Sequence, residues 1–266
     1  MTAEATIALT DLFSIHDAPH PEAAFYIARR RRAGRWRVTL AGSQASEFLR
    51  RSGWWAVPQS LSGDSPVQYH PKYAMAILSS HSHTATGGAA ELPAQIVLPA
   101  VRFTTDEYVR RSMTLNGLRM SREYFESGSL RVLQLIAARL EAGQRDVVHN
   151  VLVYLMNQIL DIRASALEAR LLRAESVAAY LGVPQERVNP LFATERLVAG
   201  AIARRIEAGA AGPLRRSLDV PALIENQVRY LLPALRECQR EERQVLWLLD
   251  EVVRLLYASR TGERSA

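Results

Sequence analysis

The pattern of apolar and polar positions divides the chain into two halves. In the second half, apolar residues recur with the period of an α-helix, most clearly over Asp146–Ile162, where they form one broad face. Similar patterns predict helices over Ser129–Glu141, Ala164–Leu181, Thr194–Ala208, Pro221–Gln239 and Glu242–Ala258. Pro233 is expected to kink the helix in which it lies, because proline removes a backbone hydrogen bond.

The first hundred residues contain shorter apolar runs. Ala23–Ala28 and Trp36–Ala41 are rich in aromatic and β-branched residues and flank a segment that can turn, so a β-hairpin is predicted. Tyr73–Leu78 fits a buried strand or a short helix, and Ala94–Phe103 fits another strand. The residues before about Pro21 are expected to form a flexible or edge-packed leader.

These elements predict an α+β fold. Residues 1–104 are expected to form a mixed region that contains the hairpin, and residues 105–258 a mainly helical bundle. Residues 259–266 are polar and are expected to be a disordered tail.

Residues 175–191 contain the pattern of a helix-turn-helix unit. Ala178, Gly182 and Val188 fall where this unit needs a small residue, a turn glycine and a buried β-branched residue. Gly182 can take a positive φ that ends the first helix, and Pro184 suits the first turn of the second helix.

In a DNA-binding unit of this kind, the early residues of the second helix contact base edges in the major groove. Gln185, Arg187 and Asn189 are the candidates here, since amide and guanidinium groups pair with bases. Pro190, however, would fall inside that helix and would push Asn189 away from helical geometry. The alternative interpretation is therefore an ordinary corner between two helices of a bundle.

The densest charge in the chain lies at the tip of the predicted hairpin. Six arginines occur within residues 29–37, with Tyr26 and Trp36 nearby. Such a cluster is typical of a phosphate-binding patch, although a solvated hairpin that resists edge-to-edge pairing would have the same composition.

Composition supports an anionic partner. The formal net charge is +6 and the isoelectric point is near 9.8, and Lys72 is the only lysine among the 33 basic residues. Arginine binds phosphate and guanine through two parallel hydrogen bonds, which lysine cannot do. The partner expected is nucleic acid, DNA or RNA. A homo-oligomer or a helical protein partner is expected in addition.

Cysteine use and the N-terminal sequence bear on the compartment. The single cysteine, Cys238, excludes internal disulfides and cysteine-based metal clusters, which fits a reducing cytosol. The N-terminus lacks the basic-then-apolar pattern of a signal peptide. The longest uncharged apolar run, Val147–Leu160, is too short to span a bilayer. A cytoplasmic protein without a membrane partner is expected.

One stretch suggests metal chemistry. The His81-Ser82-His83 sequence follows an apolar segment and resembles the His-x-His of zinc hydrolases such as JAMM-type isopeptidases. That family has a proline where this chain has Thr84, and its downstream Ser-x-x-Asp is absent at the usual spacing. The resemblance implies a zinc ion on His81 and His83, with Glu91 or Asp106 as a third ligand and His16 and His20 as outside candidates. A surface loop with incidental histidines is the alternative.

The sequence contains no complete catalytic motif, so a non-enzymatic function is favoured. It predicts a nucleic-acid-associated regulator or a subunit of a nucleoprotein assembly. A helical scaffold protein and a zinc-dependent hydrolase are the alternatives. The candidate nucleic-acid contacts are Arg29, Arg30, Arg31, Arg32, Arg35, Arg37, Gln185, Arg187, Asn189, Arg204 and Arg205.

Overall fold

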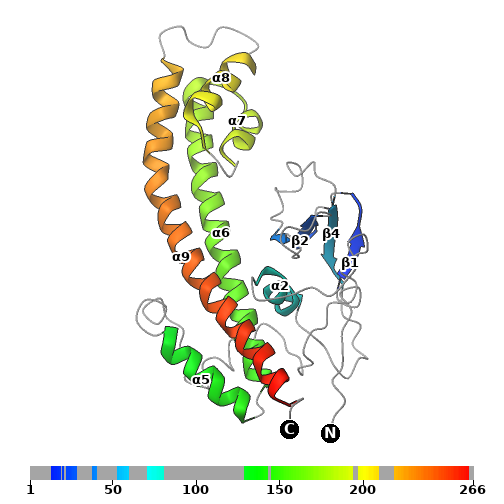
Figure 1. The fold of residues 1–266 in the computed structure, drawn as a ribbon. Helices are drawn as coiled ribbons and strands as arrows, with labels where there is room; N and C mark the ends of the chain where they lie inside the picture. The colour runs from blue at the N-terminus through cyan, green and yellow to red at the C-terminus, as the bar shows by residue number, and fades with distance from the viewer. Residues whose placement is uncertain are drawn as a thin grey trace. The chain divides into compact units, whose positions relative to one another are not determined.

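The computed structural model describes residues 13–18, 20, 22–28, 38–40, 53–59, 71–80, 129–142, 145–193, 197–209 and 219–263. Within these residues the protein is mostly helical, with a small antiparallel sheet near the N-terminus (Figure 1). The chain divides into two compact units: Met1–Gln158 with Gln244–Ala266, and Ile159–Arg243. The predicted domain boundary at residue 104 lies outside the described residues.

The sheet of the first unit has four strands in the order β1-β4-β2-β3, and its neighbouring strands are antiparallel. The strands are β1 (Phe13–His16), β2 (Phe25–Ala28), β3 (Val38–Leu40) and β4 (Gly53–Pro58). The pairing of β2 with β3 confirms the two strands of the predicted hairpin, with Ile27 opposite Val38. Residues 29–37, which join these strands, lie outside the described residues.

Two aromatic residues organise the buried side of the sheet. Tyr26 on β2 lies opposite Trp55 on β4, and their ring centroids are 5.0 Å apart. Both rings are buried, together with Ala23 and Val57. Residues 54–57 are all buried, so both faces of β4 are covered. The strand that contains Trp54 and Trp55 therefore lies inside the sheet, between β1 and β2. This position explains why its residues do not alternate between apolar and polar.

The helices of the first unit resolve an ambiguity of the sequence. Residues 73–78, which fitted either a strand or a short helix, belong to α2 (Pro71–Ser79) and are all buried. α5 spans Ser129–Glu141, as predicted. The ring of Tyr73 on α2 lies 4.7 Å from that of His149, which is hydrogen-bonded to Asn150 at 3.1 Å. One ring nitrogen of His149 thus finds a polar partner inside an apolar run.

Two long helices replace four predicted ones. α6 spans Arg145–Leu181 and α9 spans Val220–Glu263, each without a break. The predicted break near residue 163 was wrong because no glycine or proline is present there to end the helix. Pro233 lies within α9, which continues through it into the segment predicted as a tail. Residues 264–266 lie outside the described residues.

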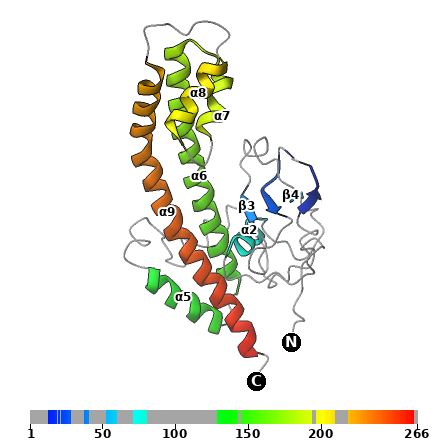
Figure 2. The same ribbon diagram turned by 45° about the horizontal axis from the view of Figure 1, so that its top comes forward.

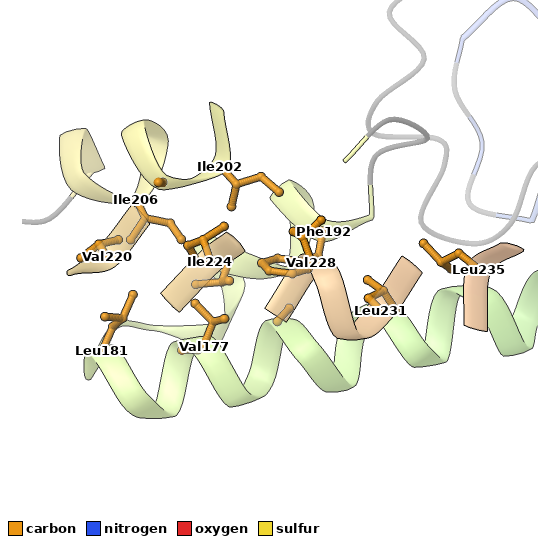
Figure 3. Close-up of a cluster of buried hydrophobic side chains, with 14 residues drawn as sticks. Val177, Leu181, Phe192, Ile202, Ile206, Val220, Ile224, Val228, Leu231 and Leu235 are labelled. Carbon is orange, nitrogen blue, oxygen red and sulfur yellow. The ribbon is translucent and has the colours of Figure 1, made fainter. Parts of the chain in front are cut away.

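The second unit is an antiparallel pair of helices, residues 159–181 of α6 and 220–243 of α9, with two short helices at one end (Figures 1 and 2). The short helices are α7 (Gln185–Phe192) and α8 (Ala199–Gly209). Their buried side chains complete one apolar cluster with α6 and α9 (Figure 3). At the other end, Arg163 forms an ion pair of 2.6 Å with Glu242.

The ends of these helices follow local capping rules. The Asp219 carboxylate accepts a hydrogen bond of 3.1 Å from the Ala222 N–H at the start of α9. Gly182 has φ of +66° and ends α6, as predicted. The Val183 N–H donates to the Ala178 carbonyl at 3.1 Å, which is the bond of a Schellman motif.

Gly182 provides a direct test of this turn. A Cβ added at residue 182 would meet no atom within 4 Å, so only the backbone conformation opposes a side chain. We expect Gly182→Ala to lower the free energy of unfolding by about 1 kcal/mol, since a left-handed conformation costs an L-residue roughly 1–2 kcal/mol. Urea denaturation followed by circular dichroism measures the change. Gly182→Asn is the control and should cost less, because asparagine tolerates this conformation. An unchanged stability of the alanine variant would contradict the turn.

Candidate nucleic-acid interface

The turn between α6 and α7 falls at the residues where the sequence pattern predicted it. Residues 182–184 form the turn, and Pro184 is the N-cap of α7 with φ of −59° and ψ of 135°. Val188 and Phe192, four residues apart, are buried and fix α7 to the core. Gln185, Glu186 and Arg187 are exposed in the first turn of α7. Two of the three predicted base-contacting residues are therefore accessible.

The third residue, Asn189, is placed differently. It is half-buried, and its side-chain Oδ1 is buried without a hydrogen-bond partner among the described residues. Pro190 lies inside α7, but the helix is short and ends two residues later at Phe192. The Ala193 N–H then donates to the Asn189 carbonyl at 2.9 Å. The side-chain oxygen of Asn189 thus faces the protein, not a ligand.

Arg187 has a structural partner that the sequence does not reveal. Its Nη1 donates to the carbonyl of Gly209 at 2.7 Å. Gly209 is the last residue of α8, and the last turn of α8 has no basic residue of its own. Arg187 therefore satisfies a terminal carbonyl and places a positive charge at the negative end of the helix dipole.

The same arrangement occurs one helix earlier. The Nη1 of Arg170 on α6 donates to the carbonyl of Phe192 at 3.0 Å. Phe192 is the last residue of α7, whose last turn also lacks a basic residue. An arginine from the preceding helix thus caps each of the two short helices. Arg170 was not among the predicted functional residues, and only the tertiary fold brings it to this position.

The remaining candidates of the second unit are on α8. Arg204 and Arg205 are exposed, and the Nε of Arg204 donates to the Gly200 carbonyl at 3.1 Å. α8 is anchored by Ile202, Ala203 and Ile206, which are buried. Because α7 contacts α8, the structure brings Gln185, Arg187 and the two α8 arginines into one small unit. The predicted contacts Arg29, Arg30, Arg31, Arg32, Arg35 and Arg37 lie outside the described residues.

Charge is balanced among the described residues of the second unit. Its described residues, which are 159–193, 197–209 and 219–243, contain ten arginines, no lysine and ten aspartates or glutamates. The net charge of +6 therefore comes from other parts of the chain. Any long-range attraction of a polyanion must depend mainly on those parts.

The described residues contain no group of three side chains that could hold a metal ion. The rings of His16 and His20 stack at 4.8 Å, and the Nδ1 of His20 accepts a hydrogen bond from the Glu22 N–H at 3.2 Å. The predicted zinc ligands His81 and His83, with Glu91 and Asp106, lie outside the described residues.

Cys238 is half-buried on α9. Burial raises the pKa of its thiol, and the nearby carboxylates of Glu241, Glu237 and Glu242 raise it further. A raised pKa keeps the thiol protonated near neutral pH, whereas a nucleophilic cysteine needs the thiolate. This environment fits a structural side chain.

No helix in the described part of the chain has the length and apolar character needed to cross a membrane. No family model, curated protein or solved structure matches this chain.

The capping role of Arg187 can be tested on its own. We expect Arg187→Ala to lower the free energy of unfolding by about 0.3–1 kcal/mol, the usual effect of a cation at an exposed helix C-terminus. Arg204→Ala is the matched control, because it removes an equal charge from α8 while its hydrogen bond stays within one helix. Chemical denaturation of both variants in low salt gives the comparison. Equal losses for both would show that Arg187 does not cap α8.

Proposed function

We propose that this is an α+β protein that associates with nucleic acid, DNA or RNA, in a regulatory or nucleoprotein assembly. The observation that carries the proposal is the arginine cluster of residues 29–37, which connects two paired strands. β2 ends at Ala28 and β3 begins at Val38, so six guanidinium groups belong to a segment whose two ends are held together. Charges concentrated in this way favour the release of counterions from a phosphate backbone.

The first turn of α7 would contribute the second contact. Gln185 and Arg187 are exposed immediately after a helix-turn-helix corner, and Gln185 offers an amide of the kind that pairs with adenine. The partial positive charge at the start of a helix favours a phosphate nearby. Since the described charges of the second unit balance, α7 would act at short range, while residues 29–37 supply the attraction.

A helical scaffold is the second candidate function. Leu172 on α6 and Tyr230 on α9 are 56% and 68% exposed, which is unusual for large apolar side chains that share one hollow of the surface. Apolar surface of this kind marks protein contacts more often than nucleic-acid contacts. Leu172 and Gln185 line one hollow, so a protein bound over Leu172 would compete with nucleic acid for Gln185, while residues 29–37 would stay separate from that contact.

The salt dependence of binding tests the proposal. The logarithm of the affinity should fall linearly with the logarithm of salt concentration, with a slope of about one unit per phosphate contact. Replacing Arg30, Arg31, Arg32 and Arg35 by alanine should flatten this slope by up to about four units. Fluorescence anisotropy with a labelled DNA duplex and a labelled single-stranded RNA measures it.

The matched control removes the same charge elsewhere, through alanine at Arg139, Arg173, Arg240 and Arg254. None of these arginines lies in residues 29–37, on α7 or on α8, so this variant should keep most of the wild-type slope. An equal flattening in both variants would mean that net charge alone drives binding. An unchanged slope in the first variant would contradict the proposed role of the cluster.

A further inference from the structure

Two stripes of opposite charge run along the long helices of the second unit. Asp161, Glu168 and Glu175 on α6 are spaced by seven residues, and all three are exposed. We call these the acidic stripe. Arg229, Arg236 and Arg243 on α9 are also spaced by seven residues and exposed, and we call these the basic stripe. Seven residues rotate around a helix by about 20° less than two full turns. Each stripe therefore stays on one face of its helix.

The two stripes have matching dimensions. Seven residues of α-helix rise about 10.5 Å, so each stripe presents three charges at the same intervals. Opposite charges at matched heptad positions are the feature that sets pairing between helices of a coiled coil. Because the stripes belong to different helices, one copy of the protein carries both halves of such a contact.

The charges of the acidic stripe have no partner in the described part of the chain. Asp161, Glu168 and Glu175 form no ion pair or hydrogen bond with any residue that the structure describes. In the basic stripe, Arg229 pairs with Glu225 at 3.0 Å, but both side chains are largely exposed. Arg236 and Arg243 form no ion pair with the described residues. No described ion pair joins the two stripes, so both remain available to another molecule.

Apolar surface accompanies the acidic stripe. A shallow hollow of about 270 Å³ is lined by Ala164, Leu167, Leu171 and Leu172 together with Glu168, Glu175 and Gln185. Ala164, Leu167 and Leu171 follow the spacing of three and four residues that is typical of a helix-packing seam. Leu172 also borders a second hollow, which contains Tyr230. A helix that packs over the acidic stripe would thus bury these leucines, with Glu168 and Glu175 at the edge of the contact.

We propose that copies of this protein associate head to tail, with the acidic stripe of one copy against the basic stripe of the next. The aliphatic stems of Arg236 and Arg243 would cover the leucines, while their guanidinium groups reach Glu168 and Glu175. A polyanion would be repelled by the carboxylates of this face, whereas a second copy supplies the complementary charge. The proposal does not depend on nucleic-acid binding.

The contact uses two different surfaces and is therefore heterologous. Each added copy leaves one acidic and one basic stripe free, so assembly continues beyond a dimer unless a ring closes. Exposed charges are screened over about 30 Å at 0.01 M salt but over about 3 Å at 1 M. Association should accordingly be strong in low salt and lost in high salt.

Charge reversal on the full chain tests the contact. One variant carries Glu168→Arg and Glu175→Arg, and the other carries Arg236→Glu and Arg243→Glu. Each then has two surfaces of the same sign, so its apparent dissociation constant should rise by about tenfold or more, since like charges in contact cost several kcal/mol and 1.4 kcal/mol is tenfold. Sedimentation velocity over a range of concentrations measures the change, after nuclease treatment of every sample.

Restoration of the charge pairing is the decisive part of this experiment. An equimolar mixture of the two variants should associate again, and so should one chain with all four substitutions. Wild-type protein that stays monomeric in 0.01 M salt would overturn the proposal. Association that survives both charge reversals would also overturn the proposal. The same holds if the mixture fails to associate although both variants keep the circular dichroism spectrum and thermal unfolding of the wild type. An additional untreated wild-type sample is the control. Association seen only in that sample would mean that nucleic acid bridges the copies, and it would also overturn the proposal.

Discussion

The second unit depends on the apolar contact between residues 159–181 of α6 and 220–243 of α9. Val177, Ile224 and Val228 are buried along this contact, and Phe192 from α7 is buried in the same cluster (Figure 3). Burying a side chain of this size contributes about 1.5–3 kcal/mol. Since the interior is filled by hydrocarbon, the chemistry of the unit is left to its surface. Function must therefore be sought at the first turn of α7 and along the outer faces of the two long helices.

Arginine serves two purposes in this part of the chain. Arg170 and Arg187 bind the terminal carbonyls of α7 and α8, and Arg163 pairs with Glu242 between the long helices. These guanidinium groups support the fold and leave fewer cations for a ligand. A count of arginines in the sequence thus overestimates the basic surface of the second unit, whose described residues carry equal numbers of positive and negative charges.

Elements with a strong local signal were predictable from the sequence. α5 was predicted with its bounds because glycines lie near both ends, and the strands of the β2–β3 hairpin were predicted from their aromatic and β-branched residues. The positive φ of Gly182 was likewise predicted. The continuity of α6 and α9 was missed, because the apolar patterns were divided at charged residues, near residue 163 and at residues 240–241. The cap from Arg187 to Gly209 joins residues far apart in sequence, so no local pattern could reveal it. The spacing of the two charged stripes was visible in the sequence but gains meaning only from the two long helices.

Hydrogen–deuterium exchange of the full chain, with and without a saturating DNA duplex, tests the central functional claim most directly. Amides that a ligand covers or stabilises exchange more slowly. The proposed function predicts slower exchange in residues 29–37 and in the first turn of α7, with little change over residues 229–243. Slower exchange confined to residues 229–243, or none anywhere in the chain at saturation, would contradict it.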